Sequence, residues 1–404
     1  MVTGAADDDC SAIGTYASAG AKFGLTLLWT APVTFPMMVA IVYLSSKLGQ
    51  VAGKGLFQLV KDHYSRWVLW PALVGVLIGN TIEAGADLAG MAAAVNIFLP
   101  VSPFLTVVGV AVMIFLLQTF GSYTLIRNVF RWLALALFAY AGAAALARPD
   151  LNEVLRGTFI PRIELSKESL SILVAIIGTT LSAYLYTWQS NVEVEEKIAE
   201  GKTRIEQRRG ASQSELQQSR RDIVIGMAFS NFIMYTIILA TGATLFKAGN
   251  HDIESAAQAA QALRPLLGPA AEALFAIGLI GVGFLAVPVM TAGASYDLCQ
   301  AVGWKASLNA RPAEARHFYI MIGAFTLAAI ALNAFGINPM KALVYAGIVQ
   351  GFSTPPLLLM IVLMTNDPKI MGDKTNSFWL NLLSWITVVA IFAASAGLVV
   401  SWLV

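Results

Sequence analysis

The sequence predicts an all-α polytopic membrane protein, on the basis of its composition and its apolar runs. Of 404 residues, 57% are hydrophobic and only 12% are charged, whereas soluble domains carry about 25% charged residues. The apolar residues gather into runs of about 20, the length that crosses a bilayer as a helix. The net charge of +2 indicates no nucleic-acid partner. We therefore expect a multi-pass protein of the cell membrane, with the lipid bilayer as its partner.

Each expected membrane-spanning helix corresponds to one apolar run. We assign these runs to residues 27–46, 68–95, 101–118, 130–147, 170–190, 223–246, 272–298, 316–335, 341–364 and 378–402. Residues 1–20 would form a further, incomplete helix, so about 11 transmembrane helices are expected. No segment looks like a separate soluble domain, and residues 1–404 are treated as a single transmembrane domain.

The distribution of Lys and Arg predicts that the N-terminus lies in the cytoplasm. Cytoplasmic loops of membrane proteins carry an excess of basic residues. With a cytoplasmic N-terminus, 18 of the 26 basic residues fall in cytoplasmic loops, and each of these loops holds at least two. The most highly charged of them, within residues 191–222, is expected to be a partly helical connector.

Three consecutive acids, Asp7, Asp8 and Asp9, lie near the start of the chain between short apolar stretches. A charged side chain at membrane depth is costly, and it usually marks an ion or substrate path. Carboxylates without nearby His or thiolate clusters favour a hard cation such as Mg²⁺, Ca²⁺ or Mn²⁺. A solvated acidic tail is the alternative, because disorder concentrates at termini.

Two segments, residues 4–14 and 178–190, combine Gly with Ser or Thr and look like interruptions of a helix. They lie five helices apart. Many secondary transporters consist of two inverted five-helix repeats, with discontinuous helices around a midplane site. On this basis residues 1–150 form the first repeat, residues 168–365 the second, and residues 378–402 an extra C-terminal helix. At 178–190 the alternative is an ordinary helix that packs through small residues.

Two further acids, Glu83 and Asp87, are predicted to share one helical face because they are four residues apart. Two acids at this spacing repel each other unless one is protonated or a cation lies between them. We therefore expect a proton path or a contact for a second ion. The alternative is a polar pair that is hydrogen-bonded to neighbouring groups.

Several stretches resemble the Nramp divalent-metal transporters. GAADDDCSAIGTYASAGAKFGLTLLW is similar to their first-helix region, in which an Asp-Pro-Gly-Asn motif precedes a Leu-Leu-Trp. LSSKLGQVAGKGL resembles their second-helix exit and IEAGADLAGMAAAVN their third helix; PPLLLMIVLMTND is also similar. The resemblance, to a divergent Nramp-related bacterial branch, implies a LeuT-like fold with metal held between a broken first and a broken sixth helix.

The resemblance also implies which residues bind the metal. Asp9 falls on the metal-binding Asp of the family, and Ala12 falls on its Asn, so that side-chain ligand is missing. Thr179 would bind through its backbone carbonyl. Ser182 replaces a soft Met thioether, which makes the site harder.

Other positions differ from the family in groups that could move protons. Tyr184 and Gln189 stand where the family has two His residues, while Asp87 falls on a third-helix Glu assigned to proton movement. Proton coupling therefore stays open. Gln350 and Tyr345 lie in the tenth span, which lines the site in related proteins. Either could instead be an interhelical hydrogen-bonding residue.

The predicted function is transport of a divalent cation by alternating access, in the Mn²⁺ and Mg²⁺ class, with Fe²⁺ also considered. The extra charge of Asp7 and Asp8 and the missing thioether both favour hard ions. The ion is the substrate, so no cofactor is expected, and we expect a monomer. The alternative is a carrier of amino acids or organic solutes on the same architecture. An enzyme is not expected, because there is no HExxH motif and no intramembrane His.

Overall fold

The computed structural model describes residues 7–120, 137–264 and 268–403, and the regular structure within these ranges is helical. Its first half contains α2 (Cys10–Phe23), α3 (Thr30–Ala52), α4 (Leu56–His63), α5 (Arg66–Val95), α6 (Pro103–Phe120), α8 (Ala139–Leu146) and α9 (Leu151–Phe159). Its second half contains α10 (Lys167–Thr180), α11 (Ala183–Ala199), α12 (Ile205–Arg208), α13 (Gln213–Thr241), α14 (Ala256–Ala260), α16 (Ala271–Val302), α17 (Arg316–Asn333), α18 (Pro339–Asn366), α19 (Pro368–Met371) and α20 (Phe378–Leu403).

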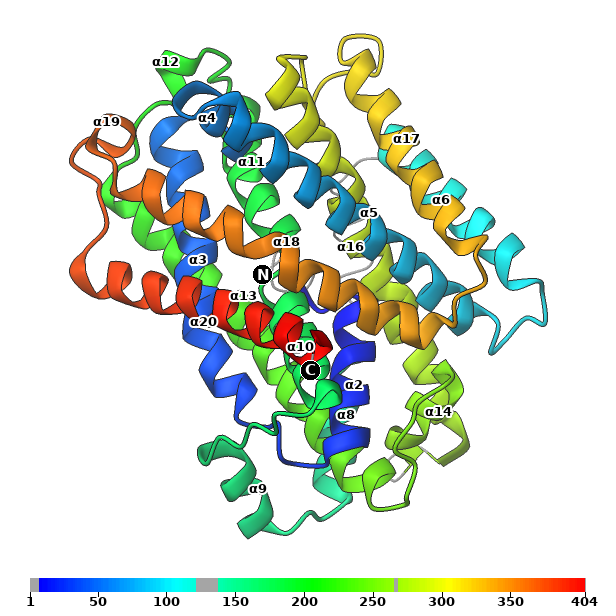
Figure 1. The fold of residues 1–404 in the computed structure, drawn as a ribbon. Helices are drawn as coiled ribbons and strands as arrows, with labels where there is room; N and C mark the ends of the chain where they lie inside the picture. Colours follow the sequence, from blue (N-terminus) through cyan, green and yellow to red (C-terminus); the bar gives the residue numbers. More distant parts are fainter. Residues whose placement is uncertain (1–6, 121–136, 265–267, 404) are drawn as a thin grey trace.

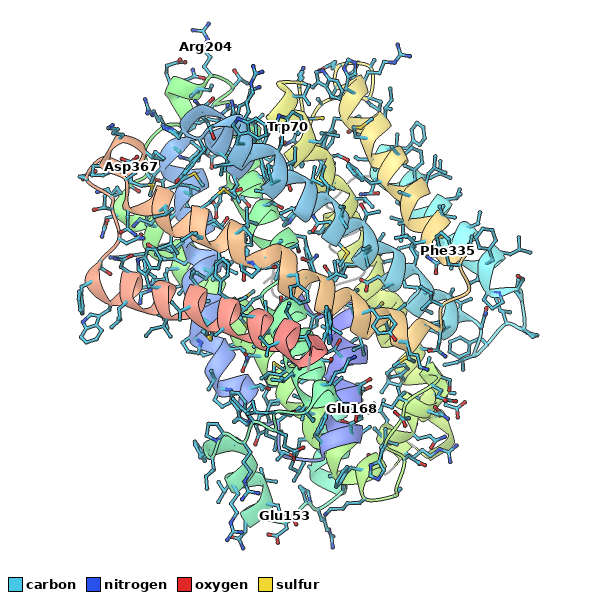
Figure 2. The ribbon with its side chains drawn as sticks, viewed as in Figure 1. Trp70, Glu153, Glu168, Arg204, Phe335 and Asp367 are labelled. Carbon is cyan, nitrogen blue, oxygen red and sulfur yellow. The ribbon has the colours of Figure 1, made fainter. Side chains whose placement is uncertain are left out.

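Nine helices within the described ranges are long and apolar enough to cross a membrane, when α10 and α11 are counted as one. Each corresponds to one of the predicted runs. The remaining run, at 130–147, falls partly outside the described residues, and α2 has only 14 residues. Figure 2 shows charged side chains at the two ends of the helix stack, with Arg204 at one end and Glu153 at the other. This arrangement is that of a polytopic membrane protein.

Helix α2 lies in the middle of the bundle (Figure 1), where it packs against α10, α13 and α18. Every residue of α2 from Cys10 to Ala21 is buried. Its sequence is rich in Gly, Ala and Ser, and small residues let membrane helices approach closely. A Cβ at Gly20, for example, would collide with the backbone oxygen of Ile238 on α13. The small residues of this segment therefore bring its N-terminus into the protein interior.

The closest approach of α10 to α18 depends on three glycines. A Cβ at Gly178 would collide with the backbone oxygen of Gly347 and the backbone nitrogen of Gly351. Because Gly347 and Gly351 are four residues apart, they lie on the same face of α18. Gly178 is only four residues before Ser182, so this contact fixes α18 against the end of α10.

We expect Gly178→Ala to lower the stability of the folded protein, because the added methyl group meets backbone atoms that cannot rotate away. Overpacking of this kind costs roughly 1–3 kcal/mol. Thermal unfolding of the purified variant, followed by size-exclusion chromatography, measures the effect. Gly109→Ala is the matched control, because no atom of the described residues lies within 4 Å of its added Cβ. Equal melting temperatures for the two variants would contradict this packing.

Candidate functional site

The sixth predicted span is interrupted, as expected, within residues 178–190. Helix α10 ends at Thr180, α11 begins at Ala183, and Ser182 between them has an extended backbone. The hydroxyl of Ser182 lies 2.9 Å from the carbonyl oxygens of both Gly178 and Thr179. These carbonyls belong to the last turn of α10, where intrahelical donors run out. The interruption thus places polar backbone groups and a hydroxyl in the bundle interior.

The N-terminus of α2 meets this interruption through Asp9, which is fully buried. Asp9 caps α2: its Oδ1 atom accepts hydrogen bonds from the amide of Ala12 at 2.7 Å and the hydroxyl of Ser11 at 2.9 Å. Its Oδ2 atom accepts from the phenol of Tyr184 on α11 at 3.0 Å. A helix N-terminus favours a negative charge, so the start of α2 stabilises this carboxylate. Asp9 therefore joins the first and sixth helices.

Glu83 and Asp87 of α5 approach the same point, and both are fully buried. Glu83 Oε1 lies 3.0 Å from the Ser11 hydroxyl, and its Oε2 accepts from the amide of Gln350 at 2.6 Å. Asp87 Oδ1 accepts from the backbone amide of Ser11 at 3.0 Å. Asp87 Oδ2 has no hydrogen-bond partner among the described residues. Three carboxyl groups from two helices thus converge on Ser11.

The hydroxyl of Ser11 is the centre of this cluster. It lies 2.9 Å from Asp9 Oδ1, 3.0 Å from Glu83 Oε1 and 3.1 Å from Thr179 Oγ1. A serine hydroxyl has one proton, and an ionised carboxylate only accepts, so Ser11 cannot donate to both carboxylates. Two buried carboxylates this close need a shared proton or a cation. The geometry of the cluster therefore favours binding of positive charge.

Asp7 and Asp8 are also fully buried but turn toward a different helix. The hydroxyl of Ser230 on α13 is within hydrogen-bonding distance of Asp7 Oδ2 and lies 3.1 Å from Asp8 Oδ1, so its single proton can serve only one of them at a time. Their other carboxylate oxygens have no partner among the described residues. Their burial contradicts the alternative of a solvated acidic tail. That Asp7 and Asp8 contribute to binding a metal ion stays a prediction.

The other predicted site residues divide into two groups. Thr179, Ser182 and Gln350 contact the cluster directly. Gln189, in contrast, donates to Glu193 Oε1 at 2.9 Å, farther along α11. Tyr345, predicted to line the site, is 53% exposed on α18, unlike the buried residues of the cluster, and its site-lining role stays a prediction. It precedes Gln350 by five residues, which rotates it about 140° around the helix.

Three contributors were not identified from the sequence as site residues: the side chains of Ser11, Asn80 and Ser230. Asn80 lies one turn before Glu83 on α5, and its Oδ1 atom is 3.3 Å from the Gln350 amide. Each is a neutral polar residue in an apolar helix, a pattern that is equally typical of interhelical hydrogen bonds. For Ser11, its place two residues after a helix-capping Asp was the available signal.

The oxygen atoms of this cluster belong to both carboxyl and hydroxyl groups. Within the described ranges, no group of three or more His, Cys, Asp or Glu side chains is arranged to hold a metal ion. An ion bound beside Asp9 would therefore also need the oxygens of Ser11, Thr179 or Ser182. The thiol of Cys10 lies 3.3 Å from the carbonyl oxygen of Leu279, so it points elsewhere.

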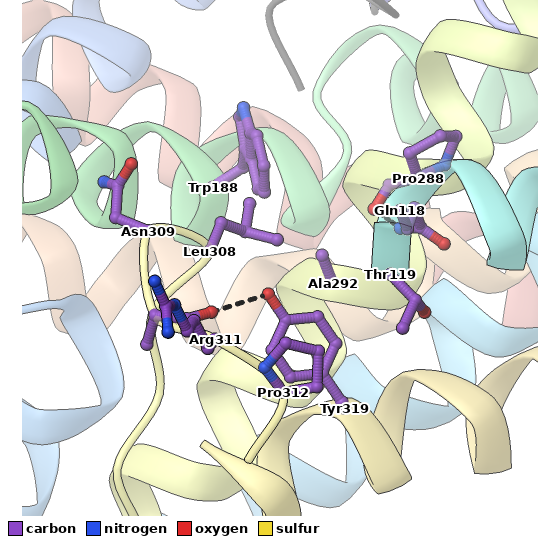
Figure 3. A pocket seen from close by; sticks show the side chains of 11 residues that line it. Gln118, Thr119, Trp188, Pro288, Ala292, Leu308, Asn309, Arg311, Pro312 and Tyr319 are labelled. Carbon is purple, nitrogen blue, oxygen red and sulfur yellow. Dashed lines mark hydrogen bonds between the residues drawn. The ribbon is translucent and has the colours of Figure 1, made fainter. Parts of the chain in front are cut away.

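A separate cavity of about 180 Å³ lies between α6, α11, α16 and the segment before α17 (Figure 3). Trp188, Pro288 and Tyr319 line it, and the Tyr319 hydroxyl donates to the carbonyl oxygen of Ala310 at 3.0 Å. None of its lining residues is acidic, and Arg311 is among them. A positive residue without an acid disfavours a cation, so we do not assign the ion site to this cavity.

Comparison with known proteins relates this chain to metal transporters along most of its length. Divalent metal cation transporter MntH of Bacillus subtilis is 27% identical over 393 residues, covering 96% of this chain and 87% of that protein. MntH of Klebsiella pneumoniae is 25% identical over 389 residues, covering 96% and 89%.

Solved structures agree on the fold. A mutant of the Eremococcus coleocola manganese transporter superposes with a TM-score of 0.72 at 17% identity, covering 98% of this chain and 84% of that one. MhsT in complex with L-phenylalanine gives a TM-score of 0.63 at 13% identity, covering 100% and 96%. These likenesses confirm the predicted LeuT-like fold.

A family model, described as natural resistance-associated macrophage protein-like, matches residues 1–401. This match includes α2, the interruption between α10 and α11, and the whole Ser11 cluster. The chain belongs to the Nramp family.

Proposed function

We propose that this protein moves divalent metal cations across the membrane by alternating access around the Ser11 cluster. The proposal rests on one observation above all. Ser11 has a single proton to share between the carboxyl groups of Asp9 and Glu83, which are both fully buried. A divalent cation would neutralise the two carboxylates and relieve their mutual repulsion.

The proposed ions are hard cations of the Mn²⁺ and Mg²⁺ class. The candidate ligands, among them Asp9, Glu83 and the hydroxyls of Thr179 and Ser182, all present oxygen, the ligand atom that hard cations prefer. The nearby Cys10 thiol is directed to Leu279 and leaves the cluster without sulfur. MntH relatives are described as divalent metal cation transporters, and the Eremococcus coleocola protein as a manganese transporter.

We further propose that Glu83 and Asp87 hold a proton or a second cation during the cycle. Asp87 has a carboxylate oxygen with no partner among the described residues, and Glu83 shares its hydroxyl donor with Asp9. Both positions would accept positive charge when the ion leaves. The protein would act as a monomer with a cytoplasmic N-terminus, since one chain supplies the cluster and 18 of 26 basic residues then lie in cytoplasmic loops.

A carrier of amino acids is less well supported by this site. Carriers of that kind bind a substrate carboxylate with free amides at a broken helix. Here the amides at the start of α2 already have partners: Ser11 N donates to Asp87, and Ala12 N donates to Asp9. The carboxylate of an amino-acid substrate at this position would also be repelled by Asp9 and Asp87.

Uptake into proteoliposomes tests the proposed function. We expect Mn²⁺ and Mg²⁺ to enter vesicles that contain the protein, and each to inhibit entry of the other because both use one site. A transmembrane pH gradient applied in parallel vesicles measures proton coupling. Uptake of amino acids without uptake of metal would contradict the proposal. Inhibition of Mg²⁺ entry by Cd²⁺ at far lower concentrations than by Mn²⁺ would contradict the preference for hard ions.

A further inference from the structure

A groove on the side of the bundle combines basic and apolar residues. It lies between α3, α13 and the segment that leads into α20, and its volume is about 820 Å³, within the range of small-molecule pockets at ~300–1,000 Å³. Its polar end is formed near the end of α3, the beginning of α13 and residues 373–377. Its apolar part runs along α3 and α20.

Lys47 is the most buried basic residue of this groove, with only 5% of its surface exposed. Its ammonium group donates to the carbonyl oxygen of Thr375 at 3.1 Å and to Asn376 Oδ1 at 3.2 Å. Both acceptors are neutral, and an ammonium has three protons to donate. Lys47 forms no ion pair with a described carboxylate. A buried charge of this kind is costly without an anion beside it.

Two more basic residues, Arg220 and Lys374, line the same end of the groove. Asp373 is the only acid among the lining residues, and it pairs with Lys374 at 3.0 Å. Arg220 has no ion pair within the described part of the chain. The groove therefore has an excess of two positive charges at its polar end.

The other end of the groove is lined by apolar residues of α3 and α20, two helices long and apolar enough to cross a membrane. Val39 lies eight residues before Lys47 on α3, about 12 Å farther into the membrane. Leu380 and Leu383 of α20 line the groove at its side. Trp379, at the start of α20, is 75% exposed, as expected of a Trp at a membrane interface. The groove is thus polar at the membrane surface and apolar below it.

We infer that this groove binds an anionic phospholipid, with its phosphate between Lys47, Arg220 and Lys374 and an acyl chain along α3 and α20. Basic pockets between transmembrane helices bind anionic headgroups in this way. The anion would compensate the buried charge of Lys47. The bound lipid would join α20 to α3 and α13, and so connect the extra C-terminal helix with the bundle that holds the ion.

Native mass spectrometry of the delipidated full-length protein tests this site, with phosphatidylglycerol and phosphatidylcholine of identical acyl chains as probes. We expect phosphatidylglycerol to bind at least about tenfold more tightly. Arg220→Gln/Lys374→Gln should weaken its binding about fivefold for each lost charge. Lys47 is left unchanged, because it holds Thr375 and Asn376 in place.

Arg221→Gln/Lys369→Gln is the matched control, since it removes two nearby charges that do not line the groove. The control variant should bind phosphatidylglycerol as the unmodified protein does, and thermal melting checks that both variants fold. Equal binding of the two lipids, or equal loss in both variants, would overturn the inference. So would displacement of the lipid by millimolar inorganic phosphate, which would identify a site for free anions.

Discussion

Asp9→Asn is expected to weaken Mn²⁺ binding by on the order of 100-fold or more, beyond the 10- to 100-fold typical of losing a group that only supports a ligand. Asparagine has nearly the shape of aspartate and also caps helices well, so the amide of Ala12 keeps an acceptor. What disappears is the negative charge at the start of α2. Isothermal titration calorimetry of the purified variant measures the change directly.

Asp150→Asn provides the matched control for this variant. Asp150 also caps a helix, α9, and accepts a hydrogen bond from the amide of Asn152 at 2.8 Å. It is exposed and lies far along the chain from the Ser11 cluster. Its variant should bind Mn²⁺ as the unmodified protein does. If Asp9→Asn bound Mn²⁺ within threefold of the unmodified protein, the carboxylate of Asp9 would not be a ligand.

Glu83→Gln is expected to lower metal uptake at least tenfold and to flatten its dependence on pH. Glutamine has nearly the shape of a protonated glutamic acid. It cannot exchange a proton with water, and it carries no negative charge for a bound ion. The carboxyl group of Glu83 contacts both Ser11 and Gln350, so it faces the cluster from α5. Uptake into proteoliposomes at several external pH values, with Mn²⁺ as the ion, separates the two effects.

Glu272→Gln is the control for that measurement, because it makes the same substitution in the first turn of α16. There Glu272 lies 3.6 Å from Arg264. Its uptake and pH response should be unchanged. Asp87→Asn should reproduce the flattened pH response, since one carboxylate oxygen of Asp87 in this cluster has no partner among the residues that the structure describes. A pH response that survives in both Glu83→Gln and Asp87→Asn would remove these acids from the proton path.

Much of the fold could be predicted from the sequence, because burial in a membrane imposes simple rules. Apolar runs must form helices, and the interruption at 178–190 was recognisable from Gly, Thr and Ser in such a run. The sequence singled out Asp9, Glu83 and Asp87, but it did not predict that they converge on Ser11. Isolated acids in apolar helices are costly, so they tend to gather around a common function.

Side-chain directions could not be predicted in the same way. Asp9 turns away from Asp7 and Asp8, because the backbone at Asp9 is extended with φ −70° and ψ 179°. Successive side chains of an extended chain point to opposite sides, so Asp9 faces Tyr184 while Asp8 faces Ser230. The central role of the Ser11 hydroxyl could not be predicted for a different reason. Its role depends on groups from α5 and α10, which are brought together only in three dimensions.

The position of a bound ion tests the central claim most directly, namely that a divalent cation completes the Ser11 cluster. Anomalous X-ray scattering from crystals grown with Mn²⁺ locates that ion without reference to transport. We expect a peak within about 2.6 Å of a carboxylate oxygen of Asp9, between α2 and the interruption before α11. Mn²⁺ bound elsewhere in the bundle, with no peak beside Asp9, would contradict the account.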